Sequence, residues 1–374
     1  MKKKVLFFLD KEWPPQHSFV DGFICSDVFR EKFEPTIVVT RQHVGSKNEI
    51  YRNVSCLCSL SSRRKFGRVL RFFESIKILR GFSKSQQDVV FIRNDPMILL
   101  AMSLLKRLGI VRKIVYQNSF PHEVHTKWAG LLAKVIFRSA LPVVDKVYVV
   151  AEGARERLLN YSPSLDFRVV SLLLQDDMII PNIVEISPNE KVRFIYVGTL
   201  AAARKIEFFL HAFFNAKKLV SEFVIDIVGG EEHEIQSLLA LDFVQDMVTC
   251  GYLNFHGKVS RTEISTYLLR SHMGISIIPP TDIYKESSPT KLGEYLGHGL
   301  PVLVTSGIPF QDAIAMQTSA CCLVEYSEEA IVSAINSLVT QPKKLTSMSH
   351  EAVFFAKNKL SYTPVIQQAC EDFL

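Results

Sequence analysis

The residues best suited to chemistry lie between Glu286 and Glu294, in the segment Glu-Ser-Ser-Pro-Thr-Lys-Leu-Gly-Glu. Ser288 is a good N-cap and Pro289 a good first helical residue, because the N–H that proline lacks would have no partner there. The N–H groups that follow, from Thr290 to Leu292, carry the positive end of the helix dipole. Such a helix end binds phosphate, and carboxylates accept hydrogen bonds from sugar hydroxyls. The segment therefore predicts a site for a nucleotide-diphosphate sugar.

The segment also resembles the signature of a known enzyme family. The spacing Glu-x7-Glu, followed by Gly299-Leu-Pro-Val, is similar to that of the retaining GT-B glycosyltransferases, in particular glycosyltransferase family 4. Two further segments align with the same pattern, Val192–Leu200 with the following Arg204-Lys205, and Phe255–Val259. The resemblance covers about residues 192–309 and implies an α/β fold of the GT-B type, with two facing Rossmann-like domains that have parallel sheets.

Several residues of the second half receive donor-side roles. Gly198 is small enough to let the backbone approach a ligand, and Arg204 and Lys205 can neutralise a leaving diphosphate. The resemblance allows either cation to be the main contact. It also implies that Glu286 faces the donor sugar and that Glu294 holds the ribose hydroxyls.

Three further donor-side candidates are weaker. Lys291 can contact phosphate or point to solvent, and the sequence favours neither. In similar enzymes the backbone that follows the glycine of Phe255-His-Gly reads the base, which makes Lys258 and Val259 base-site candidates. His256 is interpreted as a packing residue at the end of a strand.

The first half is expected to hold the acceptor. Ser119-Phe-Pro-His122-Glu123 follows a predicted strand, and a histidine at this place in the family often lies near the reacting sugar. His122 is therefore the candidate, followed by Glu123, although a helix-capping loop without chemistry explains the segment equally well. The loop after the first strand, residues 10–18, lacks the family's glycines, which indicates an acceptor-specific role for Trp13 or His17.

Residues 62–80 form a basic amphipathic pattern with one acid, Glu74. An apolar stripe is expected to pack on the sheet, and a basic face that includes Arg71 is expected to remain in water. The stripe consists of Phe66, Val69, Leu70, Phe73, Ile76 and Leu79. An ordinary Rossmann helix is one interpretation, and peripheral contact with an anionic membrane is the other, since each cation near such a surface contributes about 1 kcal/mol.

The elements that must position these residues alternate between short β-rich runs and helical patterns. In the first half, strands are predicted at Val5–Leu9, Thr36–Thr40, Val89–Ile92, Lys113–Tyr116 and Lys146–Val150. The intervening helices are predicted at Phe19–Glu31, Ser62–Arg80, Pro96–Leu108, His122–Ala140 and Gly153–Asn160. This alternation is typical of a parallel sheet covered by helices.

The second half repeats the alternation. Strands are predicted at Phe194–Val197, Val224–Val228, Gly251–His256, Met273–Ile278 and Pro301–Val304. Helices are predicted at Lys205–Leu219, Glu231–Leu241, Ser260–Arg270, Pro289–Gly297 and Ser327–Thr340. We expect an acceptor-side domain at residues 1–175, a donor-side domain at 176–356, and a C-terminal helix at 357–374 that packs back on the first domain, as in the family.

Composition is consistent with two globular domains. The chain has 374 residues, of which 48% are hydrophobic and 22% charged, and a net charge of +6. The seven cysteines fit no zinc spacing and are interpreted as reduced core residues of a cytosolic protein. We recognise neither a signal peptide nor a membrane-spanning run. The expected location is the cytoplasm, with contact at the inner face of the cytoplasmic membrane.

These patterns predict an enzyme that transfers a sugar from a nucleotide-diphosphate donor, with UDP or GDP as the expected nucleotide, to a glycan or lipid-linked acceptor. Synthesis of bacterial surface polysaccharide is the expected setting. No cofactor or metal is expected, because Arg204, Lys205 and the helix end take the place of a metal cation, and no binding of nucleic acid is expected. Two alternatives remain: a sugar-nucleotide epimerase on the same fold, and a non-catalytic GT-B protein that binds a partner or glycan.

Overall fold

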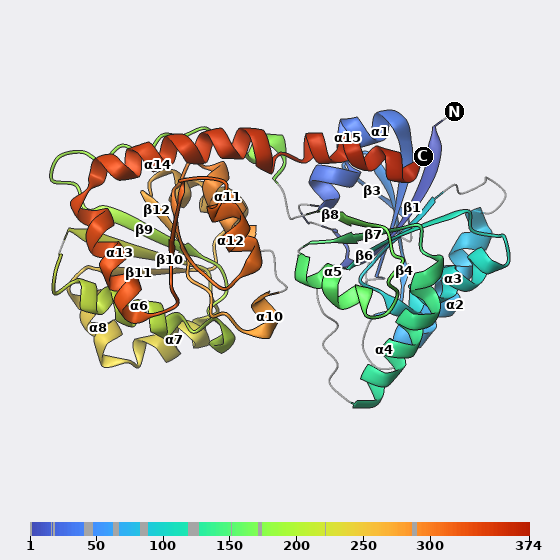
Figure 1. Cartoon of the computed structure of the whole chain (residues 1–374), viewed down its shortest axis with the longest axis horizontal. Coiled ribbons are helices and arrows are strands. Elements are labelled where there is room, and N and C mark those ends of the chain that lie inside the picture. Colours follow the sequence, from blue (N-terminus) through green and yellow to red (C-terminus); the bar gives the residue numbers. More distant parts are fainter. Residues whose placement is uncertain are drawn as a thin grey trace. The chain divides into compact units, whose positions relative to one another are not determined.

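The computed structural model describes residues 2–15, 17, 19–40, 48–62, 67–82, 89–118, 127–150, 152–170, 174–220, 222–285 and 290–374. It divides into two compact units (Figure 1). The first unit consists of Met1–Gln175 together with Tyr362–Leu374, and the second of Asp176–Ser361. In each unit, helices cover a sheet of parallel strands, and the first unit's sheet also has one antiparallel pair at its edge.

The sheet of the first unit has the strand order β3-β4-β2-β1-β5-β6-β7-β8. Its strands are β1 (Lys3–Glu12), β2 (Phe33–Thr40), β3 (Asn48–Tyr51), β4 (Val54–Leu60), β5 (Val89–Arg93), β6 (Lys113–Asn118), β7 (Lys146–Val149) and β8 (Phe167–Val169). Among these strands, only the pairing of β3 with β4 is antiparallel, and the sequence pattern did not predict β3. The chain order reverses between β1 and β5, and open α/β sheets bind ligands at such a point.

Helices cover both faces of this sheet. One face carries α2 (Gly67–Phe82), α3 (Pro96–Arg107), α4 (Lys127–Ala140) and α5 (Glu152–Leu159), which share a core with Leu6, Phe8, Val90 and Ile92. Helix α3 lies between α2 and α4 and contacts both. A second group of buried rings includes the C-terminal helix α15 (Tyr362–Phe373), whose Phe373 packs against Phe7, Phe29 and Phe91 of the same unit.

The predicted helix Phe19–Glu31 is wrong as a single element. The chain forms a short π-helix at Val20–Ile24 and then α1 (Asp27–Lys32). Ser26 separates them because its backbone is extended and its side chain accepts a hydrogen bond from the N–H of Phe29. A serine that caps a helix in this way competes with continuation of the preceding helix.

The second unit has the strand order β11-β10-β9-β12-β13-β14, with every neighbouring pair parallel. Its strands are β9 (Val192–Val197), β10 (Phe223–Val228), β11 (Leu253–Gly257), β12 (Met273–Ser276), β13 (Val302–Thr305) and β14 (Cys321–Val324). The sequence pattern did not predict β14, which is only half-buried at the edge of the sheet. Here the chain order reverses between β9 and β12.

The helices of the second unit follow its strands. They are α6 (Ile206–Ala216), α7 (Glu232–Leu239), α8 (Asp242–Thr249), α9 (Arg261–Leu269), α10 (Asp282–Lys285), α11 (Thr290–Gly297), α12 (Pro309–Ala315), α13 (Glu328–Thr340) and α14 (Pro342–Phe355). Capping explains where several of them begin. Ser260, for example, forms a capping box with Glu263 at the start of α9, and Ser327 caps α13.

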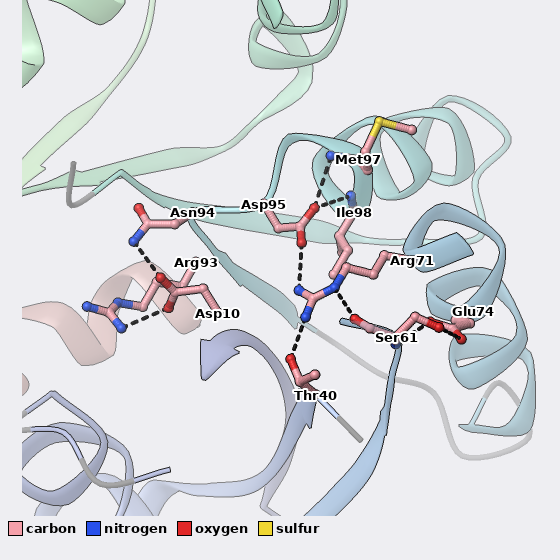
Figure 2. A network of polar contacts seen from close by, with 10 residues as sticks. All are labelled: Asp10, Thr40, Ser61, Arg71, Glu74, Arg93, Asn94, Asp95, Met97 and Ile98. Carbon is pink, nitrogen blue, oxygen red and sulfur yellow. Dashed lines mark hydrogen bonds and ion pairs between the residues drawn. The ribbon is translucent and has the colours of Figure 1, made fainter. Parts of the chain in front are cut away.

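The orientation expected for the basic helix is wrong in its first half, whereas Ile76 and Leu79 of the predicted stripe do pack against the core. In α2 the side chain of Arg71 is completely buried, whereas Val69, Leu70 and Phe73 are exposed. Arg71 Nη1 lies 2.9 Å from Asp95 Oδ2, its Nε donates to the carbonyl oxygen of Ser61, and its Nη2 bonds the hydroxyl of Thr40 (Figure 2). Arg63, Arg64, Lys65 and Phe66 of the predicted pattern lie outside the described residues. The hydrogen bonds of the buried arginine to Thr40 of β2, to Ser61 after β4 and to the N-cap Asp95 of α3 outweigh burial of the first part of the predicted stripe.

None of the described helices has both the length and the apolar character needed to cross a membrane. The seven cysteines are unbridged, and Cys25, Cys56, Cys58 and Cys370 are buried.

Candidate functional site

Two loops of the second unit meet at the carboxyl ends of β9 and β12, where the chain order reverses. The first runs from Gly198 through a 3-10 turn at Ala202–Arg204 to α6, and the second leads from β12 through α10 to α11. The described residues of both loops therefore lie at the place at which a sheet of this kind binds its ligand.

A close approach of backbones explains two glycines at this edge. A Cβ added to Gly229 would lie 2.2 Å from the carbonyl oxygen of Gly198, and Gly229 has φ +114°. Gly198 itself has φ +149°, and its missing Cβ would face Lys291 Nζ at 3.5 Å. Any larger residue at 198 would enter the space in front of that lysine, as expected of a glycine that admits a ligand.

Arg204 connects the two loops. Its guanidinium carbon lies 4.7 Å from the ring centroid of Tyr284, a residue of α10. The neighbouring Lys205 is instead exposed, adopts a left-handed conformation with φ +53°, and lies at the rim of an open hollow of about 600 Å³. That hollow is also lined by Phe208, His211 and Tyr326 of the same unit. The geometry therefore separates the two cations that the sequence treated as equivalent.

Lys291 does not point to solvent. It is buried in α11, and its Nζ lies 3.8 Å from the ring centroid of Tyr196, at the end of β9. Burial, together with the nearby positive charge of Arg204, holds the pKa of Lys291 well below its usual value, although the charge of Glu294 opposes this. Lys291 and Arg204 thus form a pair of cations supported by aromatic rings, next to Gly198.

Some of the remaining residues of α11 pack in the core of the unit, and others are accessible beside Lys291. Leu292 is completely buried and Thr290 is exposed, whereas Glu294 is half-buried one turn after Lys291. The hydroxyl oxygen of the buried Tyr295 accepts the N–H of Val197 at 2.8 Å, which ties the helix to the end of β9. Tyr196, Tyr284 and Tyr295 were missed in the sequence, although Tyr196-Val-Gly198 and Glu294-Tyr295 adjoin the motifs that were recognised.

Lys258 and Val259 lie elsewhere along the same edge. They follow β11, which is separated from β9 by β10. Lys258 is exposed and forms an ion pair with Glu231, and Val259 is half-buried. The structure therefore does not place these two residues against Arg204 or Lys291. His256 packs on the ring of Tyr267, and its Nε2 lies 2.7 Å from the buried Asp226 carboxylate.

Five sequence candidates lie outside the described residues. They are Glu286, Ser288 and Pro289 of the motif, and His122 and Glu123 of the first unit. Their roles remain predictions.

The first unit has its own polar cluster where its chain order reverses, at the carboxyl ends of β1 and β5 (Figure 2). The carboxylate of Asp10 accepts hydrogen bonds from Arg93 at 2.9 Å and from Asn94 at 3.0 Å. The Arg93 guanidinium also lies 3.1 Å from His17 Nε2, so that one buried arginine holds both ends of the glycine-free loop. Trp13 of that loop packs edge-on against Tyr51 at 5.9 Å. The sequence analysis did not identify Arg93 as a site residue, because it follows four apolar residues as the last residue of β5.

The second unit contains a recognised domain. Residues 182–353 match the model of the family described as glycosyl transferases group 1. The chain is a glycosyltransferase. The matched stretch includes Gly198, Arg204, Lys291 and Glu294.

Solved structures match this glycosyltransferase over nearly its whole length. Sucrose-phosphate synthase from Thermosynechococcus elongatus is 11% identical, with a TM-score of 0.74, over 99% of this chain and 98% of that one. A glycosyltransferase from Rickettsia africae is 14% identical, with a TM-score of 0.74, over 100% and 98%. HepE from Anabaena, solved in complex with UDP, is 12% identical, with a TM-score of 0.69, over 98% of each chain. These likenesses confirm the predicted GT-B fold of two α/β units. No curated protein sequence matches the chain.

Proposed function

We propose that the chain is a retaining glycosyltransferase of family 4 that moves a sugar from a nucleotide-diphosphate donor to a glycan or lipid-linked acceptor. The pair of cations formed by Arg204 and Lys291 is the observation that carries this proposal. Both lie where the chain order of the second sheet reverses, beside Gly198. Preorganised positive charge at this place stabilises the negative charge that develops on a leaving diphosphate.

In this proposal, residues 176–356 bind the donor. Arg204 and Lys291 contact the diphosphate, Glu294 holds the ribose hydroxyls, and Glu286 faces the sugar. The backbone N–H groups of Thr290–Leu292 contribute further hydrogen-bond donors to the phosphates. The exposed Lys205, which follows Arg204 in the chain, attracts the donor electrostatically. The similar HepE from Anabaena has been solved with UDP and with UDP-glucose, which favours a uridine donor.

The acceptor is assigned to residues 1–175, at the polar cluster around Asp10, Arg93 and Asn94. The acceptor hydroxyl attacks the anomeric carbon on the face from which the nucleoside diphosphate departs. The new C–O bond replaces the bond to the phosphate oxygen, and the acceptor proton passes to that oxygen. No step requires a metal, because the positive charge of Arg204 and Lys291 accompanies the departure. Bacterial surface polysaccharide synthesis at the inner face of the cytoplasmic membrane is the proposed setting.

Nucleotide binding tests the donor site directly. A ligand that binds only the folded state stabilises it by about 2.7 kcal/mol at 100 times its Kd, which raises the melting temperature by several degrees. We expect this shift with UDP, and smaller ones with GDP, ADP and CMP. Glu294→Ala should abolish the shift, because the ribose loses its carboxylate partner.

The control is Glu351→Ala, which removes an exposed glutamate of α14 in the same unit and should leave the UDP shift unchanged. Equal shifts in both variants would contradict the role of Glu294. If none of the nucleotides raised the melting temperature, the donor site would be contradicted. Conversion of the donor sugar without any acceptor would instead indicate an epimerase.

A further inference from the structure

Helix α2 exposes apolar side chains near its beginning. Val69, Leu70 and Phe73 are exposed by 50%, 50% and 63% of their surface. All three lie in the first two turns, because burial of Arg71, Ser75 and Leu79 fixes the opposite side of the helix against the sheet. Three large exposed apolar residues in two turns exceed what isolated surface residues explain.

Helix α4 has the same property. Leu131, Leu132 and Val135 are exposed by 58%, 58% and 60% of their surface, while Ile136, Phe137 and Ala140 are buried. The exposed residues again belong to the first half of the helix. We call Val69, Leu70, Phe73, Leu131, Leu132 and Val135 the α2–α4 surface.

The charges beside these residues have one sign. Arg68 and Lys77 of α2, and Lys134 and Arg138 of α4, are exposed. The three helices α2, α3 and α4 contain a single acid, Glu74. Its carboxylate is turned to Ser61, where it accepts the backbone N–H at 2.8 Å and the hydroxyl at 2.6 Å. Positive charge around apolar side chains complements an anionic bilayer, in which a charged head-group layer covers an apolar interior.

The position of the α2–α4 surface follows from the topology. Helix α2 follows the carboxyl end of β4, and α4 follows that of β6. In a parallel arrangement, the first turns of both helices therefore lie toward the edge of the sheet that carries Asp10, Arg93 and Asn94. Helix α3, which contacts both, begins at the same edge after β5. The exposed apolar residues are thus gathered toward the acceptor end of the first unit.

We propose that the α2–α4 surface binds the head-group layer of an anionic bilayer, with its apolar side chains inserted and its cations at the phosphates. Amphipathic helices with basic and large apolar residues bind lipid in this way. The inference rests on the proposed function in one respect: it makes the acceptor a lipid-anchored molecule presented at that edge. Membrane affinity comes from α2 and α4 together, and Arg71 has no part in it because it is buried in its ion pair.

Vesicle sedimentation with the full chain tests the proposal. Wild type should bind phosphatidylcholine vesicles containing phosphatidylglycerol at least tenfold more tightly than pure phosphatidylcholine vesicles. Phe73→Asp combined with Leu132→Asp should weaken binding to the anionic vesicles at least tenfold. The matched control is Leu108→Asp combined with Ile110→Asp, which lie after the last residue of α3 and are exposed by 72% and 50%. This control should bind as wild type does.

Each result decides the question. Failure of wild type to bind anionic vesicles, or equal binding by both double variants, would overturn the proposal. Sedimentation velocity gives a further outcome: a wild-type dimer that dissociates in the Phe73/Leu132 variant would make the surface an interface between copies of the chain. The UDP thermal shift, measured on the same proteins without vesicles, tests the donor site separately from membrane binding. Absence of that shift would contradict the donor site but would not affect the result for vesicle binding.

Discussion

Replacing Lys291 by methionine should lower transferase activity about 100- to 1,000-fold, the effect typical of losing one preorganised donor to developing negative charge. The ammonium group lies on the ring of Tyr196 and beside Arg204, at the place assigned to the leaving diphosphate. The folded protein should not lose stability, because methionine fills a similar volume without burying a charged group. Low activity together with an unchanged or raised melting temperature is therefore the expected signature.

The matched control is Lys258→Met, which removes an exposed cation of the same unit from its ion pair with Glu231. Its activity should remain within about threefold of wild type, since an exposed pair contributes about 0–1 kcal/mol. Near-normal turnover by Lys291→Met would contradict the role of Lys291. A large fall in its melting temperature would show that the lysine is structural.

Binding of UDP should also take up protons. Burial and the charge of Arg204 lower the pKa of Lys291 in the unliganded protein, and a bound diphosphate would raise it again. Between these two pKa values, binding adds a proton, so affinity falls as pH rises from the pKa of the unliganded protein to that of the complex. Calorimetry in buffers with different ionisation enthalpies measures the uptake, which should disappear in Lys291→Met. Proton release on binding would contradict this assignment.

Replacing Arg71 by methionine should lower the free energy of unfolding of the first unit by about 3–5 kcal/mol, as expected when one partner of a buried ion pair is removed. Asp95 is itself buried, and its other oxygen already caps α3 by accepting the N–H groups of Met97 and Ile98 at 3.1 Å (Figure 2). Without Arg71, its carboxylate would remain buried and would lose the guanidinium that its second oxygen contacts.

Both tryptophans, Trp13 and Trp128, belong to the first unit, so their fluorescence during urea unfolding reports on that unit. Arg68→Met, an exposed position one turn earlier, is the control and should change the free energy by less than about 0.5 kcal/mol. Adding Asp95→Asn to Arg71→Met should restore part of the loss, because asparagine caps the helix without a charge. A loss below about 1 kcal/mol for Arg71→Met would mean that the ion pair is not needed.

The sequence by itself determined the architecture and indicated which loops lie where the order of the second sheet reverses. Short β-rich runs alternating with helical patterns specify two parallel sheets, because both periods are local properties of the chain. The glycine after β9, the cations before α6 and the Glu-x7-Glu spacing are local as well. Their order therefore identified the segments that surround the point where the order of the second sheet reverses, before any tertiary contact was considered.

Only the tertiary structure decided that Arg71 and Lys291 are buried rather than exposed to solvent. Apolar residues occur on several sides of α2, so its periodicity allowed more than one buried face. The buried face was chosen by Asp95, which lies 24 positions beyond Arg71 in the chain. The sequence left the environment of Lys291 undecided for the same reason. The ring that its Nζ contacts belongs to Tyr196 of β9, the strand that pairs with β12. A side chain whose partner is distant in sequence has no local signal of its environment, because only the folded sheet brings the two together.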